Sequence, residues 1–453
     1  MTRLQFNRFL IASALCFALA LLCASGLSAT TFYVDTAADA GGDGTTSALT
    51  GATCAWDTIA DVNAASFNAG DSILFKRGCT WREQLTVPSS GSAGSVITFG
   101  AYGEGADPII KGSVAPSAWA SGGIWRTAYA PTLDSTQATS GERNYRDVIP
   151  ANQSSYTGTK IRITAKAGAG GNWVLDGASI GAMTTADDFD ADPTRITWDS
   201  GSAGATVPAG GTKVSDEITF TFTKTSRYGM HSYSANRANI AYGTIVLANA
   251  LYNDSDGVDD TLTKTVAYAA QSNLVYGFSK LEVYETLPAN VWVATTTVSV
   301  DVGNLIFDNE DSVGTKQATL AALDSQGDFY YETATGLLFL YSEEDPATYY
   351  TAIEAAKKAY GIYVLGKSYV TIDGIDIRYV GANAISLYGI PTGTDNIIVQ
   401  NCHLAYIGGS YLTGTLRYGN GVEVQSSATN IIVRYNSLDN IYDCGISAEG
   451  SIA

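Results

Sequence analysis

The stretches VTIDGIDI (residues 370–377), IIVQNCHL (397–404) and IIVRYNSL (431–438) decide the fold of this chain. Apolar and polar residues alternate within each of them with a period of two, which indicates β-strands. A shorter apolar unit follows each stretch, and one more precedes the set; these units lie at 361–364, 384–387, 421–424 and 445–447. Ile372, Val399 and Val433 occupy equivalent positions 27 and 34 residues apart. Repeats of about 20–50 residues are typical of solenoids.

Short β-branched strands separated by Gly and Asn predict the coils of a parallel β-helix, in which each coil pairs only with its neighbours. Ile372, Val399 and Val433 should then stack in one file inside the core. An ordinary β-sandwich with chance similarity is the alternative. The wider spacing before Val422 leaves residues 405–420 outside the stack as a loop. Long loops on a rigid scaffold are where function tends to lie.

Composition and charge fit an extracellular β protein. The 453 residues include 47 Gly and 27 Tyr, and only 15% are charged, which favours a turn-rich all-β fold. The formal net charge of −18 argues against nucleic acid and anionic membranes as partners. The same repulsion applies to polyanionic sugars, unless a bound cation or a local basic cleft screens it.

Residues 1–29 have the pattern of a secretory signal: Arg3 and Arg8, an apolar run at 9–22, and the small-residue site Leu27-Ser28-Ala29. An uncleaved anchor is one alternative. A lipoprotein is another, although Leu22 precedes Cys23 where a small residue is needed. We therefore expect a secreted, periplasmic or cell-surface protein that has no membrane contact after cleavage.

Four cysteines follow the signal. Cys54 and Cys79 flank one helix-plus-strand unit and could form a disulfide in an oxidising compartment. Cys402 lies on a core strand, where a buried free thiol is equally plausible. None of the four cysteines has the spacing that zinc ligands show.

Residues 30–126 should form the N-terminal cap and the first coils. A strand at 31–34 precedes a short helix within 56–67, for which Asp57 is a plausible N-cap and Ile59, Val62 and Phe67 form the apolar face. Such a helix would cover the open end of a β-helix core. Further strands are expected at 72–76, 85–87, 96–99 and 108–112.

The segments GDSILFKRG (70–78), TWR (80–82) and ITFGAYG (97–103) resemble the N-terminal coils of secreted right-handed parallel β-helix proteins of the pectate-lyase-like superfamily. The segments at 406–409, 417–423 and 441–446 resemble later coils of that superfamily. The resemblance covers 30–126 and 288–453. It implies the fold, and it is only suggestive for activity because the superfamily contains lyases, hydrolases, epimerases and binding proteins.

Residues 127–287 interrupt the coil pattern and should form an inserted β-sandwich. Its expected strands include 160–164, 195–198, 217–222 and 280–284. The section from Gly177 to Asp216 resembles a jelly-roll module found beside secreted carbohydrate-active enzymes, which implies glycan contact; a spacer is the alternative. Asp254, Asp256, Asp259 and Asp260 surround a Gly turn and could bind Ca²⁺, although their spacing is not that of an EF-hand and favours a solvated acidic loop.

The β-helix should resume at 288–453. Strands at 304–307 and 336–341 are expected to rejoin the scaffold, and 345–358 reads as helix-like. The chain stops at Ala453 in mid-coil with no polar cap. We therefore expect truncation at the C-terminus, with further coils that could carry essential residues.

Stacking suggests two sets of functional residues. Asp376, His403 and Ser437 should form one outward column, with neighbours about 5 Å apart. The second set surrounds the long loop: Glu423 and Asp443 are candidate catalytic carboxylates, since glycoside hydrolysis needs such a pair. The residues expected to contact substrate are Arg417, Tyr418, Asn420, Tyr442, His403, Asp376 and Arg434.

These residues predict a monomer that cleaves glycosidic bonds of an extracellular polysaccharide and requires no cofactor. A lyase would add Ca²⁺ and a strong base, for which Arg434 is available. A non-catalytic glycan-binding or adhesive surface protein is the third possibility, because Tyr and Trp faces stack on sugars in either case.

Overall fold

The computed structural model describes residues 29–184, 188–244, 250–254, 257–266, 269–272, 274–389 and 393–449. They form two compact units, one from residues up to 120 together with 290 onwards, and one from residues 121–289. The inserted unit therefore starts a few residues earlier and ends slightly later than expected. No helix among the described residues is long and apolar enough to cross a membrane.

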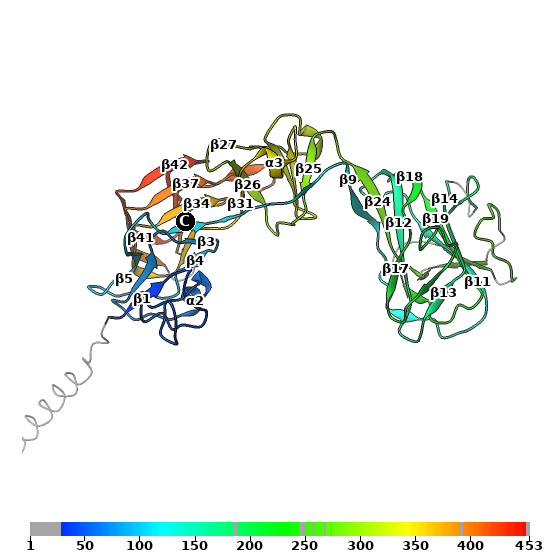
Figure 1. Cartoon of the computed structure of the whole chain (residues 1–453), viewed down its shortest axis with the longest axis horizontal. Helices are drawn as coiled ribbons and strands as arrows, with labels where there is room; N and C mark the ends of the chain where they lie inside the picture. Colours follow the sequence, from blue (N-terminus) through cyan, green and yellow to red (C-terminus); the bar gives the residue numbers. More distant parts are fainter. Residues whose placement is uncertain are drawn as a thin grey trace, which may run out of the picture. The chain divides into compact units, whose positions relative to one another are not determined.

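Three parallel sheets form the β-helix part of the first unit, and after β1 each coil contributes one strand to each sheet (Figure 1). Sheet 1 consists of β1 (Thr31–Val34), β2 (Ser72–Lys76), β5 (Ile97–Tyr102), β33 (Ser368–Asp373), β36 (Thr394–Gln400) and β41 (Ala428–Arg434). Sheet 2 consists of β3 (Thr80–Trp81), β6 (Ile109–Lys111), β34 (Asp376–Val380), β37 (His403–Ile407) and β42 (Ser437–Ile441). Sheet 3 consists of β4 (Leu85–Thr86), β32 (Ile362–Leu365), β35 (Ile385–Tyr388), β40 (Val422–Gln425) and β43 (Ile446–Glu449).

The predicted stacking register is confirmed. Ile372 pairs with Val399, and Val399 pairs with Val433. The first coils and the later ones form one continuous stack, because Phe99 on β5 pairs directly with Ile372 on β33. Their inward side chains share a single apolar core, in which both residues are fully buried. The fold is therefore an all-β parallel β-helix.

A left-handed residue forms the corner between sheets 1 and 2 in every later coil. Gly374, Asn401 and Tyr435 occupy this position with φ of 68°, 54° and 57°. Gly and Asn adopt this conformation at little cost, whereas Tyr is strained there. Asn401 donates to Asp373 Oδ1 of the coil below at 2.7 Å, which helps to hold the corner.

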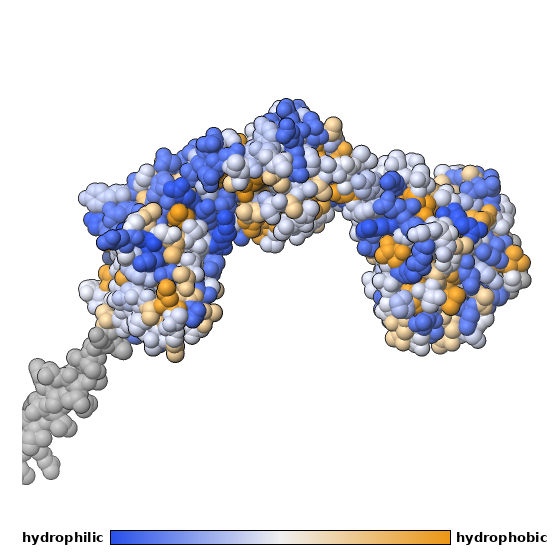
Figure 2. Space-filling view, in the orientation of Figure 1, coloured by the Kyte–Doolittle hydropathy of each residue, from blue (hydrophilic) through white to orange (hydrophobic). Residues whose placement is uncertain are grey.

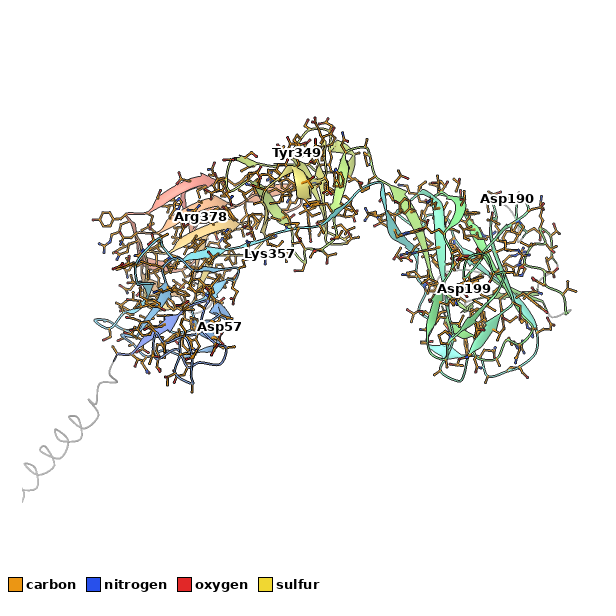
Figure 3. All side chains as sticks on the ribbon, viewed as in Figure 1. Asp57, Asp190, Asp199, Tyr349, Lys357 and Arg378 are labelled. Atoms are coloured by element: carbon orange, nitrogen blue, oxygen red, sulfur yellow. The ribbon has the colours of Figure 1, made fainter. Side chains whose placement is uncertain are left out.

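The helix that covers the core is α2 (Ile59–Ala64), and it buries Ile59 and Val62 as expected. Its N-cap is Thr58 and not Asp57, because the Thr58 hydroxyl accepts from the backbone N–H of Asp61. Asp57 lies one residue earlier, beside the start of the helix (Figure 3).

Residues 290–358 do not rejoin the parallel sheets, so that expectation was wrong. They form an antiparallel module with its own apolar core. Its strands pair with each other and with the short β7 (Ser113–Val114) and β8 (Trp119–Ala120). They are β25 (Val291–Ala294), β26 (Val302–Phe307), β27 (Ser312–Val313), β28 (Thr315–Lys316), β29 (Asp328–Glu332), β30 (Leu337–Tyr341) and β31 (Ile353–Lys357).

The helix-like stretch at 345–358 is also shorter than expected. Only α3 (Pro346–Tyr349) is helical, and β31 occupies the rest. Tyr349 at the end of α3 is labelled in Figure 3. Residues 320–322 form one 3₁₀ turn (Leu320–Ala322).

The unit at 121–289 is built from antiparallel sheets around one core that includes the fully buried Trp173 and Trp198. One sheet has the order β15-β14-β19-β11-β21-β22 and another the order β17-β12-β24-β9, with β18 also pairing β12. The bounds of its strands are β9 (Gly123–Tyr129), β10 (Ser135–Thr136), β11 (Arg143–Ile149), β12 (Gly158–Lys166), β13 (Trp173–Leu175), β14 (Gly177–Ala182), β15 (Thr194–Arg195), β16 (Ala205–Val207), β17 (Thr212–Val214), β18 (Ile218–Phe222), β19 (Tyr228–Ser234), β20 (Ala241–Thr244), β21 (Ala250–Asp254), β22 (Ala269–Ser272), β23 (Leu274–Tyr276) and β24 (Phe278–Thr286).

The expected disulfide between Cys54 and Cys79 is not formed, and both are free thiols. The buried Cys54 sulfur lies 3.4 Å from the carbonyl oxygen of Asp39, whereas the Cys79 sulfur lies 3.5 Å from Asp35 Oδ1. The two sulfurs therefore face different partners. Cys402 is a buried free thiol, and burial raises its pKa to about 12.

Candidate functional site

The loop that leaves the stack between β37 and β40 forms a hairpin of β38 (Ser410–Thr413) and β39 (Leu416–Tyr418). It is shorter than the expected 405–420, because Ala405 to Ile407 still belong to β37. Arg417 and Tyr418 are consecutive on β39, and successive strand residues point to opposite faces. Arg417 lines a pocket on one side, and Tyr418 lies near Glu423 on the other.

Glu423 lies on the outward face of sheet 3 and is nevertheless only 4% exposed. Its neighbour Val422 points inward and is fully buried. The Glu423 carboxylate accepts hydrogen bonds from Asn383, from Ser386 Oγ at 3.2 Å and from Gln425 Nε2 at 2.7 Å. Burial raises the pKa of Glu423, and the charge of Glu449 adds to this, while the bonds from Gln425 and Ser386 oppose it.

Four half-buried tyrosines surround this carboxyl on the outward face of sheet 3, and we call them the tyrosine cluster: Tyr360, Tyr363, Tyr388 and Tyr418. Tyr360 and Tyr363 stack with ring centroids 5.0 Å apart. Burial raises the pKa of Tyr360, and the charge of Glu423 raises it further. Aromatic faces beside a carboxyl whose pKa is raised are suited to binding sugar rings and donating a proton.

A pocket of about 350 Å³ lies between the hairpin, the ends of β37 and β42, and the β26–β28 segment. We call it the hairpin pocket. The guanidinium of Arg417 stacks over the ring of Tyr442 at 4.5 Å, and both residues line the pocket. Arg417 Nε donates to Gly409 O at 2.6 Å, and Nη2 donates to Gly303 O at 3.1 Å. The two predicted residues Arg417 and Tyr442 are therefore brought together.

A buried ion pair supports the wall of the hairpin pocket. Lys316 Nζ lies 2.7 Å from each carboxylate oxygen of Asp301, and Asp301 also accepts from Tyr411 N. Burial lowers the pKa of Lys316 to about 8; Asp301 opposes this shift, whereas the positive charges of Arg417 and Lys358 add to it. Sequence reasoning missed both members of the pair, because 301 and 316 lie in the module that was expected to be ordinary coils.

The second candidate carboxylate, Asp443, is exposed and lies one coil later. Its backbone N–H donates to Gly419 O at 3.1 Å, which places it beside the base of the hairpin. Among the described residues no contact joins the carboxyl groups of Glu423 and Asp443. The pair expected from sequence therefore shares a region without forming a contact.

Asn420 has a structural partner on each side. Its N–H donates to Asn383 Oδ1 at 2.8 Å, and its own Oδ1 accepts from Cys444 N at 3.1 Å. These bonds link three successive coils at the corner before sheet 3. Arg434 lies on sheet 1, where it donates to Gln400 Oε1 at 2.9 and 2.7 Å. Neither residue joins the hairpin pocket.

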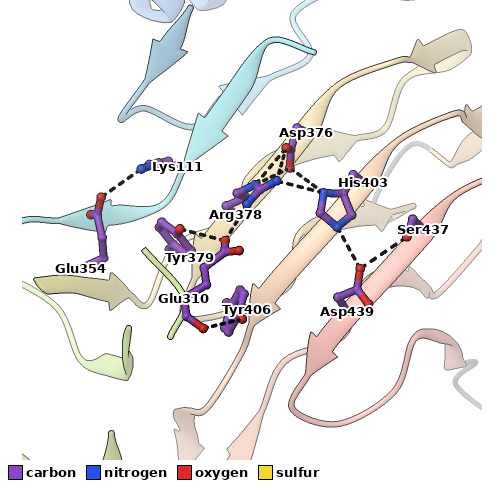
Figure 4. A network of polar contacts seen from close by, with 10 residues as sticks. All are labelled: Lys111, Glu310, Glu354, Asp376, Arg378, Tyr379, His403, Tyr406, Ser437 and Asp439. Atoms are coloured by element: carbon purple, nitrogen blue, oxygen red, sulfur yellow. Dashed lines mark hydrogen bonds and ion pairs between the residues drawn. The ribbon is translucent and has the colours of Figure 1, made fainter. Parts of the chain in front are cut away.

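The predicted column on sheet 2 is confirmed in register, since Asp376 pairs with His403 and His403 pairs with Ser437. Figure 4 shows that its side chains belong to a larger network. His403 lies between two carboxylates, with Nδ1 3.3 Å from Asp376 Oδ1 and Nε2 3.0 Å from Asp439 Oδ2. In Figure 2 this outer side of β34, β37 and β42 is largely hydrophilic.

The network holds the loop that leads to the hairpin pocket (Figure 4). Arg378, which is labelled on β34 in Figure 3, binds Asp376 and also donates to Glu310 Oε1 at 2.6 Å. Tyr379 donates to the same Glu310 oxygen at 2.8 Å. Glu310 precedes β27 and β28, which line the pocket. Asp376 and His403 are thus linked through Arg378 to Glu310, next to the segment that lines the pocket.

The expected Ca²⁺ ligands are only partly described. Asp256 and the side chain of Asp254 lie outside the described residues. Asp259 accepts from the Thr261 N–H and hydroxyl, which is the pattern of a turn. Within the described ranges no group of three or more His, Cys, Asp or Glu side chains could hold a metal ion.

The inserted unit has a smaller pocket of about 280 Å³ lined by Phe220, Tyr228, Asp190 and Asp192 among others. Phe220 and Tyr228 pack edge to face with centroids 5.6 Å apart. Glycan contact by this unit stays a prediction.

One family model agrees with the fold of the later coils. Residues 328–452 match the family model described as the right-handed beta helix region. A solved structure of the GH136 lacto-N-biosidase from Eubacterium ramulus is similar at 11% identity and a TM-score of 0.35, over 93% of this chain and 36% of that chain. XylC in complex with xylose is similar at 12% identity and a TM-score of 0.27, over 92% of this chain and 56% of that chain.

A further solved structure, titled glycoside hydrolase, is similar at 9% identity and a TM-score of 0.27, over 93% of this chain and 80% of that chain. This chain thus spans about a third of the length of the lacto-N-biosidase. No curated protein sequence matches it.

Proposed function

We propose that the β-helix unit binds an extracellular polysaccharide where the hairpin meets sheet 3, and that it cleaves a glycosidic bond there. The observation that carries the proposal is the environment of Glu423, a buried carboxyl with a raised pKa that lies near Tyr360 and Tyr418, on the side of the hairpin opposite the hairpin pocket. Glycoside hydrolysis needs one carboxylic acid that keeps its proton near neutral pH and can donate it to the leaving oxygen. Burial shifts the pKa of Glu423 in this direction.

Asp443 is the candidate for the second carboxylate. It is exposed to solvent one coil away, and its backbone is tied to Gly419 at the base of the hairpin. In glycoside hydrolases the second carboxylate acts as nucleophile or as the base that activates water. A sugar ring bound on the tyrosine cluster would lie near Glu423, and Asp443 would act from the neighbouring coil.

A non-catalytic glycan-binding protein is the second candidate, and two observations favour it. Glu423 is only 4% exposed, and it makes no contact with Asp443. A lyase is disfavoured, because Arg434 is bound to Gln400 on sheet 1 and not at the pocket.

The test is to incubate the full chain with a panel of extracellular polysaccharides, and to follow new reducing ends and the absorbance of unsaturated uronates. Reducing ends without unsaturated products are expected for the proposed hydrolase. Unsaturated products would show a lyase, and binding without either product would show the non-catalytic alternative.

The matched pair of variants is Glu423→Gln and Glu344→Gln, since both remove one carboxylate and Glu344 is exposed outside the site. The first should abolish turnover while the protein stays folded, and the second should leave turnover unchanged. Full turnover by Glu423→Gln would remove Glu423 from the mechanism.

A further inference from the structure

We infer that the hairpin pocket recognises an anionic group, a carboxylate or a sulfate ester, carried on a sugar ring. This deepens the proposed function, on which it rests for the choice of a sugar as ligand. The net charge of −18 opposes acidic glycans in general. The charges around the hairpin pocket favour an anionic ligand, and they act at much shorter range.

Arginines of this unit usually find carboxylates. Arg77 pairs with Asp107, Arg82 pairs with Glu354, and Arg378 pairs with Asp376 and Glu310. Arg417 lines the hairpin pocket and has no carboxylate partner among the described residues. In a chain with 44 acidic and 26 basic residues, such an arginine is conspicuous.

Arg417 is also held in place before any ligand arrives. Two of its N–H groups donate to the carbonyl oxygens of Gly409 and Gly303, and its guanidinium lies against Tyr442. An arginine carries five N–H donors, so three have no acceptor in the described part of the chain. A fixed guanidinium with spare donors matches the two oxygens of a carboxylate or sulfate and loses little entropy on binding.

Gly409 is required for this placement. A Cβ there would meet the Gly303 carbonyl oxygen at 2.4 Å and Arg417 Nη2 at 2.8 Å, and its φ is +92°. The close approach of the backbone at Gly409 to the backbone at Gly303 thus fixes the position of the Arg417 side chain.

The charge balance around the hairpin pocket is positive. Lys316, Lys358 and Arg417 supply three cations, against the carboxylate of Asp301, which pairs with Lys316, and the exposed Asp443, which follows Tyr442 at the base of the hairpin. Lys358 instead donates to the backbone oxygen of Tyr411 at 2.5 Å. At physiological ionic strength charges beyond about 8 Å are largely screened, so these near cations outweigh the distant carboxylates.

The test measures binding of three matched sugars to the full chain by ligand-observed NMR titration: glucose, glucuronate and glucose 6-sulfate. They share one ring and differ in the group on carbon 6. Inorganic sulfate is the fourth probe. At least one anionic sugar should bind roughly tenfold or more tightly than glucose, since hydrogen bonds to charged groups contribute about 1.5–3 kcal/mol. The stronger of the two identifies carboxylate or sulfate ester as the preferred group.

Three variants separate the pocket from bulk charge. Arg417→Gln should remove the preference, and Arg417→Lys should weaken it although the net charge is unchanged. Arg434→Gln makes the same charge change on sheet 1 and should preserve the preference. Thermal melting checks that each variant is folded. If Arg417→Gln does not fold, Arg417→Lys takes its place as the test of the preference.

Equal binding of glucose and both anionic sugars, or no binding of either anionic sugar at tens of millimolar, overturns the inference. So does an equal effect of Arg417→Gln and Arg434→Gln, or inorganic sulfate binding as tightly as the better anionic sugar. Glu423→Gln should keep the preference. Loss of the proposed cleavage activity and loss of the anion preference are therefore separate results.

Discussion

The guanidinium of Arg417 lies 4.5 Å from the ring centre of Tyr442, across the gap between the hairpin and the last described coil. Arg417 comes from β39, and Tyr442 directly follows β42. The contact therefore ties a loop that leaves the stack to a coil that belongs to it, and it fixes one wall of the hairpin pocket.

Tyr442→Ala should weaken binding of anionic sugars, because the guanidinium loses the ring that orients it. A cation–π contact at an exposed site contributes about 0.5–1 kcal/mol, so a two- to fivefold rise in Kd is expected. Tyr442→Phe keeps the ring and should bind normally, as measured by the same NMR titration. Equal losses for Ala and Phe would assign the effect to the hydroxyl group.

Glu423 should make stability depend on pH. Burial raises its folded pKa above the unfolded value of about 4.3. Its contribution is therefore fully present below about pH 4, and it is lost as pH rises through the folded pKa. The free energy of unfolding of the wild type should fall relative to that of Glu423→Gln as the pH rises above about 4, as measured by urea denaturation. Glu344→Gln should track the wild type throughout.

The Lys316–Asp301 pair should also show strong coupling. Lys316→Met leaves the Asp301 carboxylate buried without its cation, which typically costs about 3–5 kcal/mol. Asp301→Asn together with Lys316→Met removes both charges and should recover most of that loss. A double variant no more stable than Lys316→Met, measured by urea denaturation at pH 7, would contradict the pairing.

The stack itself can be tested at one inward position. Leu404 pairs with Ile377 below and Leu438 above, and it is fully buried. Leu404→Ala should lower the free energy of unfolding by about 2–5 kcal/mol. Ile432 points outward on sheet 1 and is 46% exposed, so Ile432→Ala should cost less than about 0.5 kcal/mol. Similar losses at both positions would mean that the inward register is wrong.

Thiol accessibility tests the cysteine assignments. The exposed Cys444 should react quickly with iodoacetamide in the folded protein. Cys54 and Cys402 are buried and should react only after unfolding. Mass spectrometry after alkylation without reductant should find all four thiols labelled in denaturant. Unlabelled Cys54 and Cys79 under those conditions would restore the predicted disulfide.

The coils could be predicted from the sequence because they repeat. Ile372, Val399 and Val433 fall in one file because parallel pairing of similar strands allows one register that keeps the apolar face inward. Residues 290–358 were misread because strands such as β26 and β30 have the same apolar content as coil strands. β30 pairs locally with β29, but β26 pairs with β31, which lies far along the chain, and a local pattern does not reveal such a partner.

For the site, the sequence analysis correctly predicted that Arg417 and Tyr442 lie close together beside the long loop. It also placed Asp376, His403 and Ser437 in one column. It could not show that Asp376 is bound by Arg378, or that Asp301 and Lys316 stand beside Arg417. The Asp376–Arg378 contact lies within one coil strand and the Asp301–Lys316 pair lies within the antiparallel module, and the approach of that pair to Arg417 joins the module to the coils.

The sequence by itself determined the β-helix, its inward files and the residues near the hairpin, because alternation and repeat spacing follow from strand geometry alone. Only the tertiary structure decided which charges meet. It buried Glu423 under tyrosines, paired Lys316 with Asp301 and left Arg417 without a carboxylate at a pocket, because electrostatic environment depends on neighbours that chain order does not specify.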